Sequence, residues 1–160
     1  MNKQKEGRLF EDRIHSIICK TKSSVLREKH IRAFYSSHIS AIDHLLINGD
    51  YCIAIQDKHV ISSKPSNVDI NHFKSCVNDL SIILNRRCIG IYLSLLEPTI
   101  HAMRSIEFEN KHNNNYFIFI NNINAEKLIM DFLHCLYVNK IYVYDDEDTY
   151  MLGTELNFIQ

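Results

Sequence analysis

The chain has 160 residues, of which 46% are hydrophobic, with only 4 Gly and 2 Pro. This composition predicts one folded domain over residues 1–160 and excludes a fibrous or disordered chain. The net charge of −1 is unevenly distributed: residues 1–40 hold nine Lys or Arg against four Asp or Glu, a balance of +5, and the rest balance to −6. A basic first third suits contact with phosphate groups, although a solvated helix face gives the same pattern.

The sequence predicts an intracellular protein, in the cytoplasm or nucleus, without a membrane partner. No apolar run reaches the roughly 18 to 20 residues that span a bilayer, and the charged N-terminus lacks the apolar stretch of a signal peptide. Reduced, buried thiols are expected, because the cysteines are widely spaced and form no CxxC pair. There are five of them: Cys19, Cys52, Cys76, Cys88 and Cys135. The Asn- and Ile-rich, Gly-poor composition favours an AT-rich genome, such as that of a virus.

In the first part of the chain the apolar spacing predicts a helix and then a hairpin. The helix spans about 6–19, because Phe10, Ile14 and Ile18 fall on one stripe at helical spacing. The following HIRAFYS segment fits either a short strand or a helical turn. Strands are expected at about 40–47 and 51–58, and their apolar residues on both faces indicate a sheet that is covered on each side.

The remaining elements alternate between helix and strand. Helices are expected at about 69–84, 99–112 and 125–138, and strands at about 88–96, 116–121 and 141–148. This order, with room for one more strand before the hairpin, predicts an α/β fold with a mixed central sheet flanked by helices.

The turn of the hairpin sets which side chains share a face. Asn48-Gly49 is a strong type I′ turn signal, and a two-residue turn there pairs Ile47 with Asp50. Asp43 then faces Ala54. A four-residue loop keeps the same faces, whereas a three-residue loop reverses them.

With these faces, Asp43, Gln56 and Lys58 converge on one side of the sheet, while His44 and Asp57 lie on the other. A carboxylate and an amide oxygen at this spacing can hold one Mg²⁺ ion, and a neighbouring lysine can stabilise charge on a phosphate. An ordinary ion pair between Asp43 and Lys58 is the simpler alternative. Glu11 lies at the margin of the first helix's apolar stripe, from which it can supply a further carboxylate.

These residues resemble the PD-(D/E)xK, or restriction-endonuclease-like, nuclease superfamily. GRLFE, with Glu11, resembles its helix string G-x-x-F-E. Asp43 in AIDHLL resembles its second-strand aspartate, and AIQDK, with Lys58, resembles its (D/E)-x-K strand. The resemblance covers about 6–96 and implies an αβββαβ core, to which 97–160 adds a C-terminal α/β extension.

The resemblance implies an endonuclease that hydrolyses DNA phosphodiester bonds with Mg²⁺ or Mn²⁺. Glu11, Asp43 and Gln56 become the metal-site residues, and Lys58 becomes the catalytic lysine. Duplex or branched DNA, including Holliday junctions, is the substrate class, and a homodimer is the expected assembly.

Gln56 departs from the motif, which usually has Asp or Glu at this position. Its amide oxygen can still bind a cation, although one negative charge is lost. Asp57 is the alternative ligand if a bulge rotates it toward Asp43. His72 and Lys74, early in the following helix, are candidate substrate contacts or else a surface pair.

Two other functions remain open. Gln56 fits a catalytically weakened module that binds DNA or a protein without cleaving. The third reading is an α/β scaffold whose hairpin residues form only an ion pair.

Overall fold

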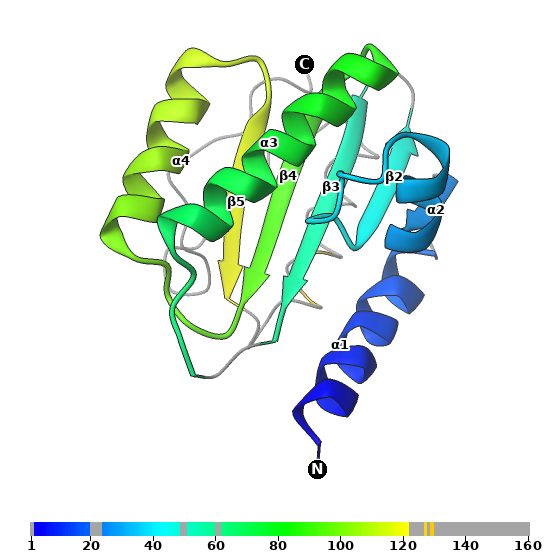
Figure 1. Cartoon of the computed structure of the whole chain (residues 1–160), viewed down its shortest axis with the longest axis vertical. Coiled ribbons are helices and arrows are strands. Elements are labelled where there is room, and N and C mark those ends of the chain that lie inside the picture. Colours follow the sequence, from blue (N-terminus) through cyan, green and yellow to red (C-terminus); the bar gives the residue numbers. More distant parts are fainter. Residues whose placement is uncertain are drawn as a thin grey trace.

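The computed structural model describes residues 2–19, 24–48, 51–59 and 62–121, together with Lys127 and Ile129. The predicted helix at 125–138 and strand at 141–148 lie outside the described residues, except that Lys127 and Ile129 are helical. The elements are α1 (Lys3–Ile18), β1 (Ser24–Arg27), α2 (Glu28–Phe34), β2 (His44–Asn48), β3 (Tyr51–Lys58), α3 (Asn67–Leu84), β4 (Arg87–Ser94), α4 (Ile100–His112) and β5 (Tyr116–Asn121) (Figure 1).

The five strands form one mixed sheet in the order β1-β2-β3-β4-β5. The pairs β1–β2 and β2–β3 are antiparallel, and β4 and β5 continue the sheet parallel to β3. The predicted α/β fold with a mixed central sheet is therefore confirmed. The ambiguous HIRAFYS segment is mostly helical, within α2, and β1 is the additional strand before the hairpin.

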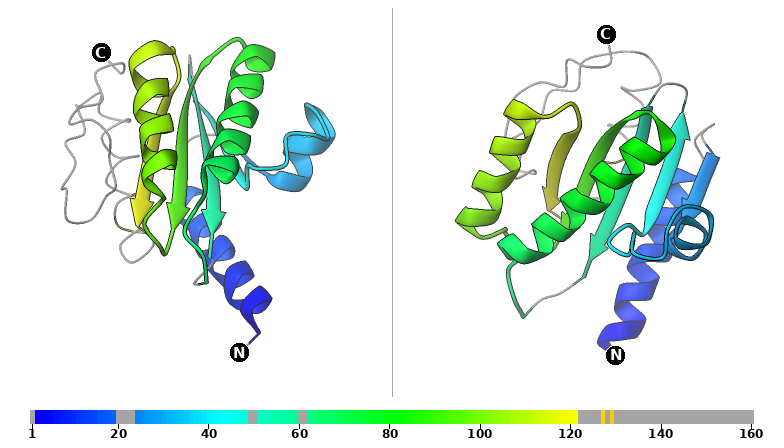
Figure 2. Two further views of the ribbon diagram at one scale, coloured as in Figure 1. Left: turned by 60° about the vertical axis from the view of Figure 1, so that its left-hand side comes forward. Right: turned by 45° about the horizontal axis from the view of Figure 1, so that its top comes forward.

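Helices cover both faces of the sheet, with α3 and α4 on one face and α1 on the other (Figures 1 and 2). Side chains alternate along a strand, so Ile53 and Ile55 of β3 pack toward α1, whereas Cys52 and Ala54 pack toward α3. β4 is buried at every position after Arg87, which explains its almost uninterrupted apolar sequence.

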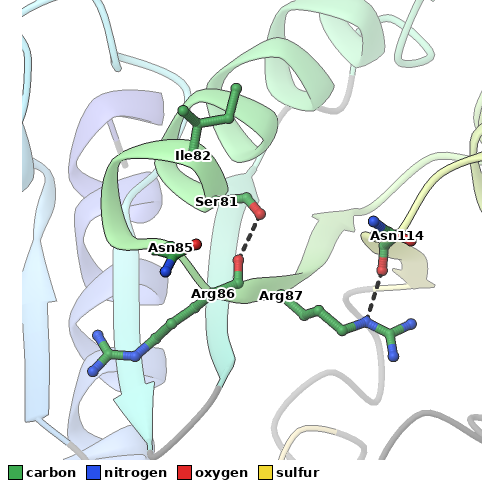
Figure 3. Close-up of a pocket in the computed structure, with 6 residues that line it drawn as sticks. All are labelled: Ser81, Ile82, Asn85, Arg86, Arg87 and Asn114. Carbon is green, nitrogen blue, oxygen red and sulfur yellow. Dashed lines mark hydrogen bonds between the residues drawn. The ribbon is translucent and has the colours of Figure 1, made fainter.

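Capping residues fix where α3 begins and ends. Ser66 and Asp69 form a capping box at its start, and Asn85 ends it in the left-handed conformation with φ 49°. The start of α3 faces the end of β3, and its far end leads through Arg86 into β4 (Figure 3). None of the helices in the described part of the chain is long and apolar enough to cross a bilayer.

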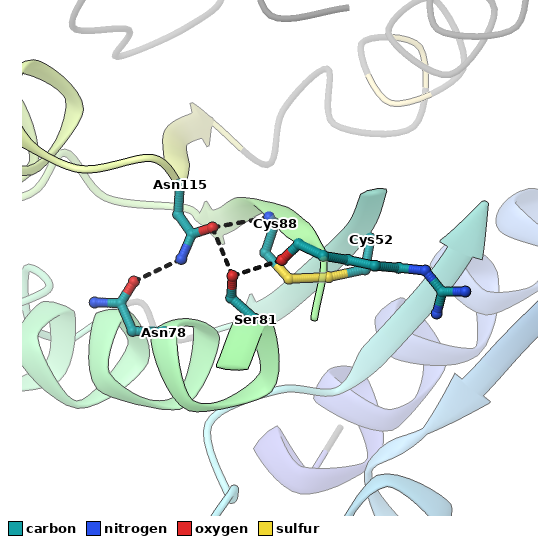
Figure 4. Close-up of a disulfide and its surroundings, with 6 residues drawn as sticks. Cys52, Asn78, Ser81, Cys88 and Asn115 are labelled. Carbon is teal, nitrogen blue, oxygen red and sulfur yellow. Dashed lines mark hydrogen bonds between the residues drawn. A yellow bond between two sulfur atoms is a disulfide. The ribbon is translucent and has the colours of Figure 1, made fainter. Parts of the chain in front are cut away.

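The structure corrects the prediction that the cysteines are reduced, because Cys52 and Cys88 are joined by a disulfide (Figure 4). The two residues are register partners on the adjacent parallel strands β3 and β4, and both side chains face α3. Their Cα atoms are 4.7 Å apart, within the range that a disulfide bridges. Of the described cysteines, Cys76 is a buried thiol as expected, whereas the Cys19 thiol is exposed.

Candidate functional site

The candidate site lies where β2 begins and β3 ends, and we call this region the hairpin mouth (Asp43, His44 and Gln56–Lys58). The predicted register pairs Ile47 with Asp50, whereas the structure pairs Asn48 with Tyr51. The prediction is therefore wrong by one residue on each strand. The type of turn at Asn48-Gly49 lies outside the described residues. Both registers place the same side chains on the same faces, since the sum of paired residue numbers stays odd. The predicted grouping of polar side chains is therefore preserved.

The Asp43 carboxylate is held from two directions at the hairpin mouth. Its Oδ2 accepts hydrogen bonds from Gln56 Nε2 at 2.9 Å and from the Asp57 backbone N–H at 2.7 Å. Its own N–H donates to the Ile55 carbonyl at 2.8 Å. Burial, and then the negative charge of Asp57, raise the pKa of Asp43 to about 7.

Gln56 and Lys58 line a cavity of about 250 Å³ between the hairpin mouth and the start of α3. His72 lines the same cavity, and its Nε2 lies 3.0 Å from Ser40 Oγ. Gln56 Oε1 is buried and has no hydrogen-bond partner among the described residues. An oxygen without a partner at this depth is suited to bind a cation or an ordered water.

The opposite face of the hairpin mouth carries the pair of His44 and Asp57, as the alternation of side chains predicts. His44 is fully buried and the Asp57 side chain is 4% exposed, with His44 Nε2 and Asp57 Oδ2 2.6 Å apart. Burial raises the pKa of Asp57 despite the hydrogen bond to His44. Because the Asp57 N–H binds Asp43, this pair holds the backbone that positions the Asp43 carboxylate.

Glu11 lies on α1 and is paired with Arg27 of β1. Arg27 donates to Glu11 Oε1 at 2.6 Å and to Asp12 Oδ1 at 2.9 Å. Burial is the largest cause that raises the pKa of Asp43 and of Asp57, and the negative charge of Glu11 raises both to a lesser degree. Glu11 therefore acts on the hairpin mouth through its charge. Within the described residues, no three Asp, Glu, His or Cys side chains are grouped so that they could hold a metal ion.

The two residues predicted as substrate contacts separate in the structure. His72 lines the cavity beside Gln56 and Lys58. Lys74 instead points to α4, where its Nζ donates to Ser105 Oγ at 2.6 Å and pairs with Glu109 at 3.5 Å. The side chain of Lys74 is only 12% exposed, and its charge offsets that of the buried Glu109.

The oxygen atoms at the hairpin mouth are of the kind that hard divalent cations bind. Mg²⁺ commonly binds one or two carboxylates and completes its shell with water and phosphate. Asp43 and Gln56 Oε1 provide such atoms on one face, and Asp57 Oδ1 lies on the other. In the described part of the chain neither Gln56 Oε1 nor Asp57 Oδ1 has a hydrogen-bond partner, and both are buried. The Asp57 side chain remains on the His44 side, so it is not rotated onto the face that carries Asp43.

Sequence reasoning missed several residues around this site. The alternation of side chains places His44 with Asp57 on the face opposite Asp43, but it does not indicate that the two side chains are paired. Asp69 also lines the cavity. The hydrogen bond from the Ser66 backbone N–H is the largest cause that lowers the pKa of Asp69, and the hydrogen bond from the Ser66 side chain lowers it further. No sequence signal marked Arg27 as the partner of Glu11, because the four-residue β1 that carries it is too short to recognise.

Neither the models of protein families nor the curated proteins gave a match to this chain. Among solved structures, the chain is similar to the crystal structure of a repair endonuclease from Pyrococcus abyssi, with 16% sequence identity and a TM-score of 0.46. The similarity covers 76% of this chain and 48% of that one, so the chain spans about half the length of its neighbour. The residues of the hairpin mouth, and not this distant likeness, carry the functional proposal.

Proposed function

We propose that the protein is a DNA endonuclease that hydrolyses phosphodiester bonds with Mg²⁺ or Mn²⁺. The observation that carries this proposal is the partly buried Asp43 carboxylate, which accepts a hydrogen bond from the amide of Gln56. The Oε1 of that amide is buried and has no hydrogen-bond partner among the described residues. Lys58 lines the cavity on the same face. A buried carboxylate with a strongly raised pKa costs stability, and such groups concentrate at functional sites.

Asp43 and Gln56 Oε1 would hold the cation on the cavity side. When bound, a divalent cation polarises a phosphate oxygen and lowers the pKa of bound water. The Lys58 ammonium would stabilise negative charge on the phosphate, and His72 would contact the substrate backbone from α3. His44 and Asp57 would keep Asp43 in place through the Asp57 N–H.

The expected substrate is duplex or branched DNA, including Holliday junctions, and the expected assembly is an intracellular homodimer. The basic residues 1–40 support a polyanionic substrate. A dimer would allow two symmetrical cuts in a branched substrate.

Cleavage assays with supercoiled, linear and four-way-junction DNA test this proposal. Cleavage should require Mg²⁺ or Mn²⁺, stop with EDTA, and fall by orders of magnitude in Asp43→Asn and Lys58→Ala. Lys64→Ala is the matched control, because Lys64 is exposed in the loop before α3. Full activity in both site variants would refute the site, and loss of activity in the control would point to general damage.

A binding module that does not cleave is the second candidate, and the pairing of Glu11 with Arg27 favours it. That pairing occupies a carboxylate that the nuclease motif would place near the metal. This function predicts DNA or protein binding that is insensitive to EDTA. Gln56→Glu separates the two candidates, because the additional carboxylate should increase cleavage by an enzyme and leave a binding module inactive.

A further inference from the structure

A second polar cavity, of about 540 Å³, lies at the other end of the sheet (Figure 3). It is formed where α3 ends and β4 begins, and is lined by Ser81, Ile82, Asn85, Arg86, Arg87 and Asn114. Arg87 is level with Tyr51 of β3, whereas Ser94 is level with Lys58. Seven residues along a strand correspond to about 23 Å, so one phosphate cannot contact both this cavity and Lys58.

The chemistry of this cavity favours an oxyanion. Two guanidinium groups and two side-chain amides line it, and none of the lining residues that the structure describes carries a carboxylate. Guanidinium groups bind phosphate oxygens through paired, charge-assisted hydrogen bonds. A ligand of the phosphate class is therefore the best match.

Hydrogen bonds fix the framework from which the two arginines extend. Arg87 Nε donates to the Asn114 carbonyl at 3.0 Å, and Ser81 Oγ donates to the Arg86 carbonyl at 2.5 Å. Asn115 joins the same framework, because its Oδ1 accepts from the Cys88 N–H at 2.9 Å and lies 3.1 Å from Ser81 Oγ (Figure 4). A framework fixed in advance lowers the entropic cost of binding.

The two arginine side chains leave the start of β4 in opposite directions (Figure 3). Groups that diverge in this way suit two phosphates along a polymer better than one small ion. A structural role is the competing explanation, because cations after a helix C-terminus stabilise its dipole. No residue of the last turn of α3 is basic, so Arg86 and Arg87 are well placed for that role too.

We propose that Arg86 and Arg87 form a second phosphate-binding site, which contacts the DNA backbone away from the point of cleavage. The proposal that this site binds phosphate groups follows from the residues that line the cavity. The proposal that those phosphate groups belong to DNA depends on the proposed function. Binding measured in EDTA separates the two, because it requires no cleavage.

The test is the salt dependence of binding to an end-labelled DNA duplex, measured by fluorescence anisotropy in EDTA. Each phosphate contact adds about 0.9 to the slope of log K against log salt. Arg86→Gln and Arg87→Gln should each reduce that slope by about 1, and Arg86→Lys should retain most of it. Arg104→Gln on α4 is the matched control and should leave the slope unchanged.

Inorganic phosphate distinguishes a free ligand from the DNA backbone. If phosphate raises the melting temperature of the wild type but not of Arg86→Gln/Arg87→Gln, while the DNA slopes do not change, the site takes free phosphate or nucleotides and DNA is excluded. If neither the slopes nor the phosphate effect changes, the site is refuted. Lower stability with unaltered slopes and phosphate response would assign the arginines to the helix terminus.

Discussion

Asp43→Asn is expected to stabilise the protein without metal and to abolish its cleavage of DNA. The asparagine oxygen can accept the same hydrogen bonds from Gln56 and Asp57, so the variant removes the charge and little else. Burial and the charge of Asp57 raise the pKa of Asp43 from 3.8 to about 7. At roughly 1.4 kcal/mol for each pKa unit, the ionised carboxylate costs about 4 kcal/mol near neutral pH.

The effect has a defined pH dependence, because the folded state binds the proton of Asp43 more tightly than the unfolded state. Below about pH 4 both states are protonated, so the variant and the wild type should have similar unfolding free energies. The wild type loses stability as the pH rises from about 4 to about 7, and the difference is constant above that. The advantage of the variant should therefore grow from near zero to about 4 kcal/mol, an upper limit if the site relaxes.

Urea unfolding followed by circular dichroism, in EDTA at several pH values, measures this difference. Asp79→Asn on α3 is the control, because that carboxylate is 43% exposed and its removal should change stability little. Mn²⁺ should raise the melting temperature of the wild type and not of Asp43→Asn. If the variant has no advantage at about pH 8, Asp43 is not destabilised by burial and by Asp57, and the reasoning fails.

Three further predictions concern the hairpin mouth and the sheet behind it. Gln56→Glu should lower stability in EDTA, because it places a second carboxylate beside Asp43, and should tighten Mn²⁺ binding by about tenfold, as calorimetry can measure. His44→Leu leaves the buried Asp57 carboxylate unpaired and should cost about 3 to 5 kcal/mol, much of which Asp57→Asn should restore in a double-mutant cycle. Gly90→Ala should cost about 1 to 3 kcal/mol in urea unfolding, because its Cβ would lie 2.6 Å from Phe117 Cδ1.

Each of these predictions has a result that contradicts it. Unchanged Mn²⁺ affinity in Gln56→Glu would place the cation away from position 56. Additive effects of the His44 and Asp57 substitutions would show that the two side chains are not coupled. An unchanged urea midpoint in Gly90→Ala would mean that the Phe117 ring moves aside at no cost.

That Asp43 and Gln56 share one face of the sheet was predictable, because the face depends only on whether the sum of paired residue numbers is odd or even. Turns centred on 48–49 and on 49–50 give the same faces, so the error in register did not move the polar side chains between layers. The register itself was not predictable, since Asn48-Gly49 is a local signal and packing decides between the two turns. The observed pairing places Leu46 opposite Ile53 within the core that faces α1.

Contacts between distant segments were beyond sequence reasoning for a different reason. The alignment of Cys52 with Cys88 depends on how α3 crosses from β3 to β4, and no residue pattern encodes that offset. The pairing of Glu11 with Arg27 likewise requires the position of α1 against a four-residue strand. In both cases the sequence drew attention to one or both residues of the pair, but it did not indicate that they contact each other.

Three carboxylates lie at or near the hairpin mouth, and their negative charges affect one another. Asp43 lies beside Gln56, and Asp57 and Glu11 lie on the α1 side of the sheet. The charges of Asp57 and Glu11 nevertheless raise the pKa of Asp43. Arg27 offsets part of this charge through Glu11, and His44 offsets another part through Asp57. The Asp43 carboxylate accepts hydrogen bonds from the Gln56 amide and from the Asp57 backbone N–H. A cation bound beside Asp43 would offset part of this negative charge, and for this reason Asp43 is the residue on which the proposed function depends most.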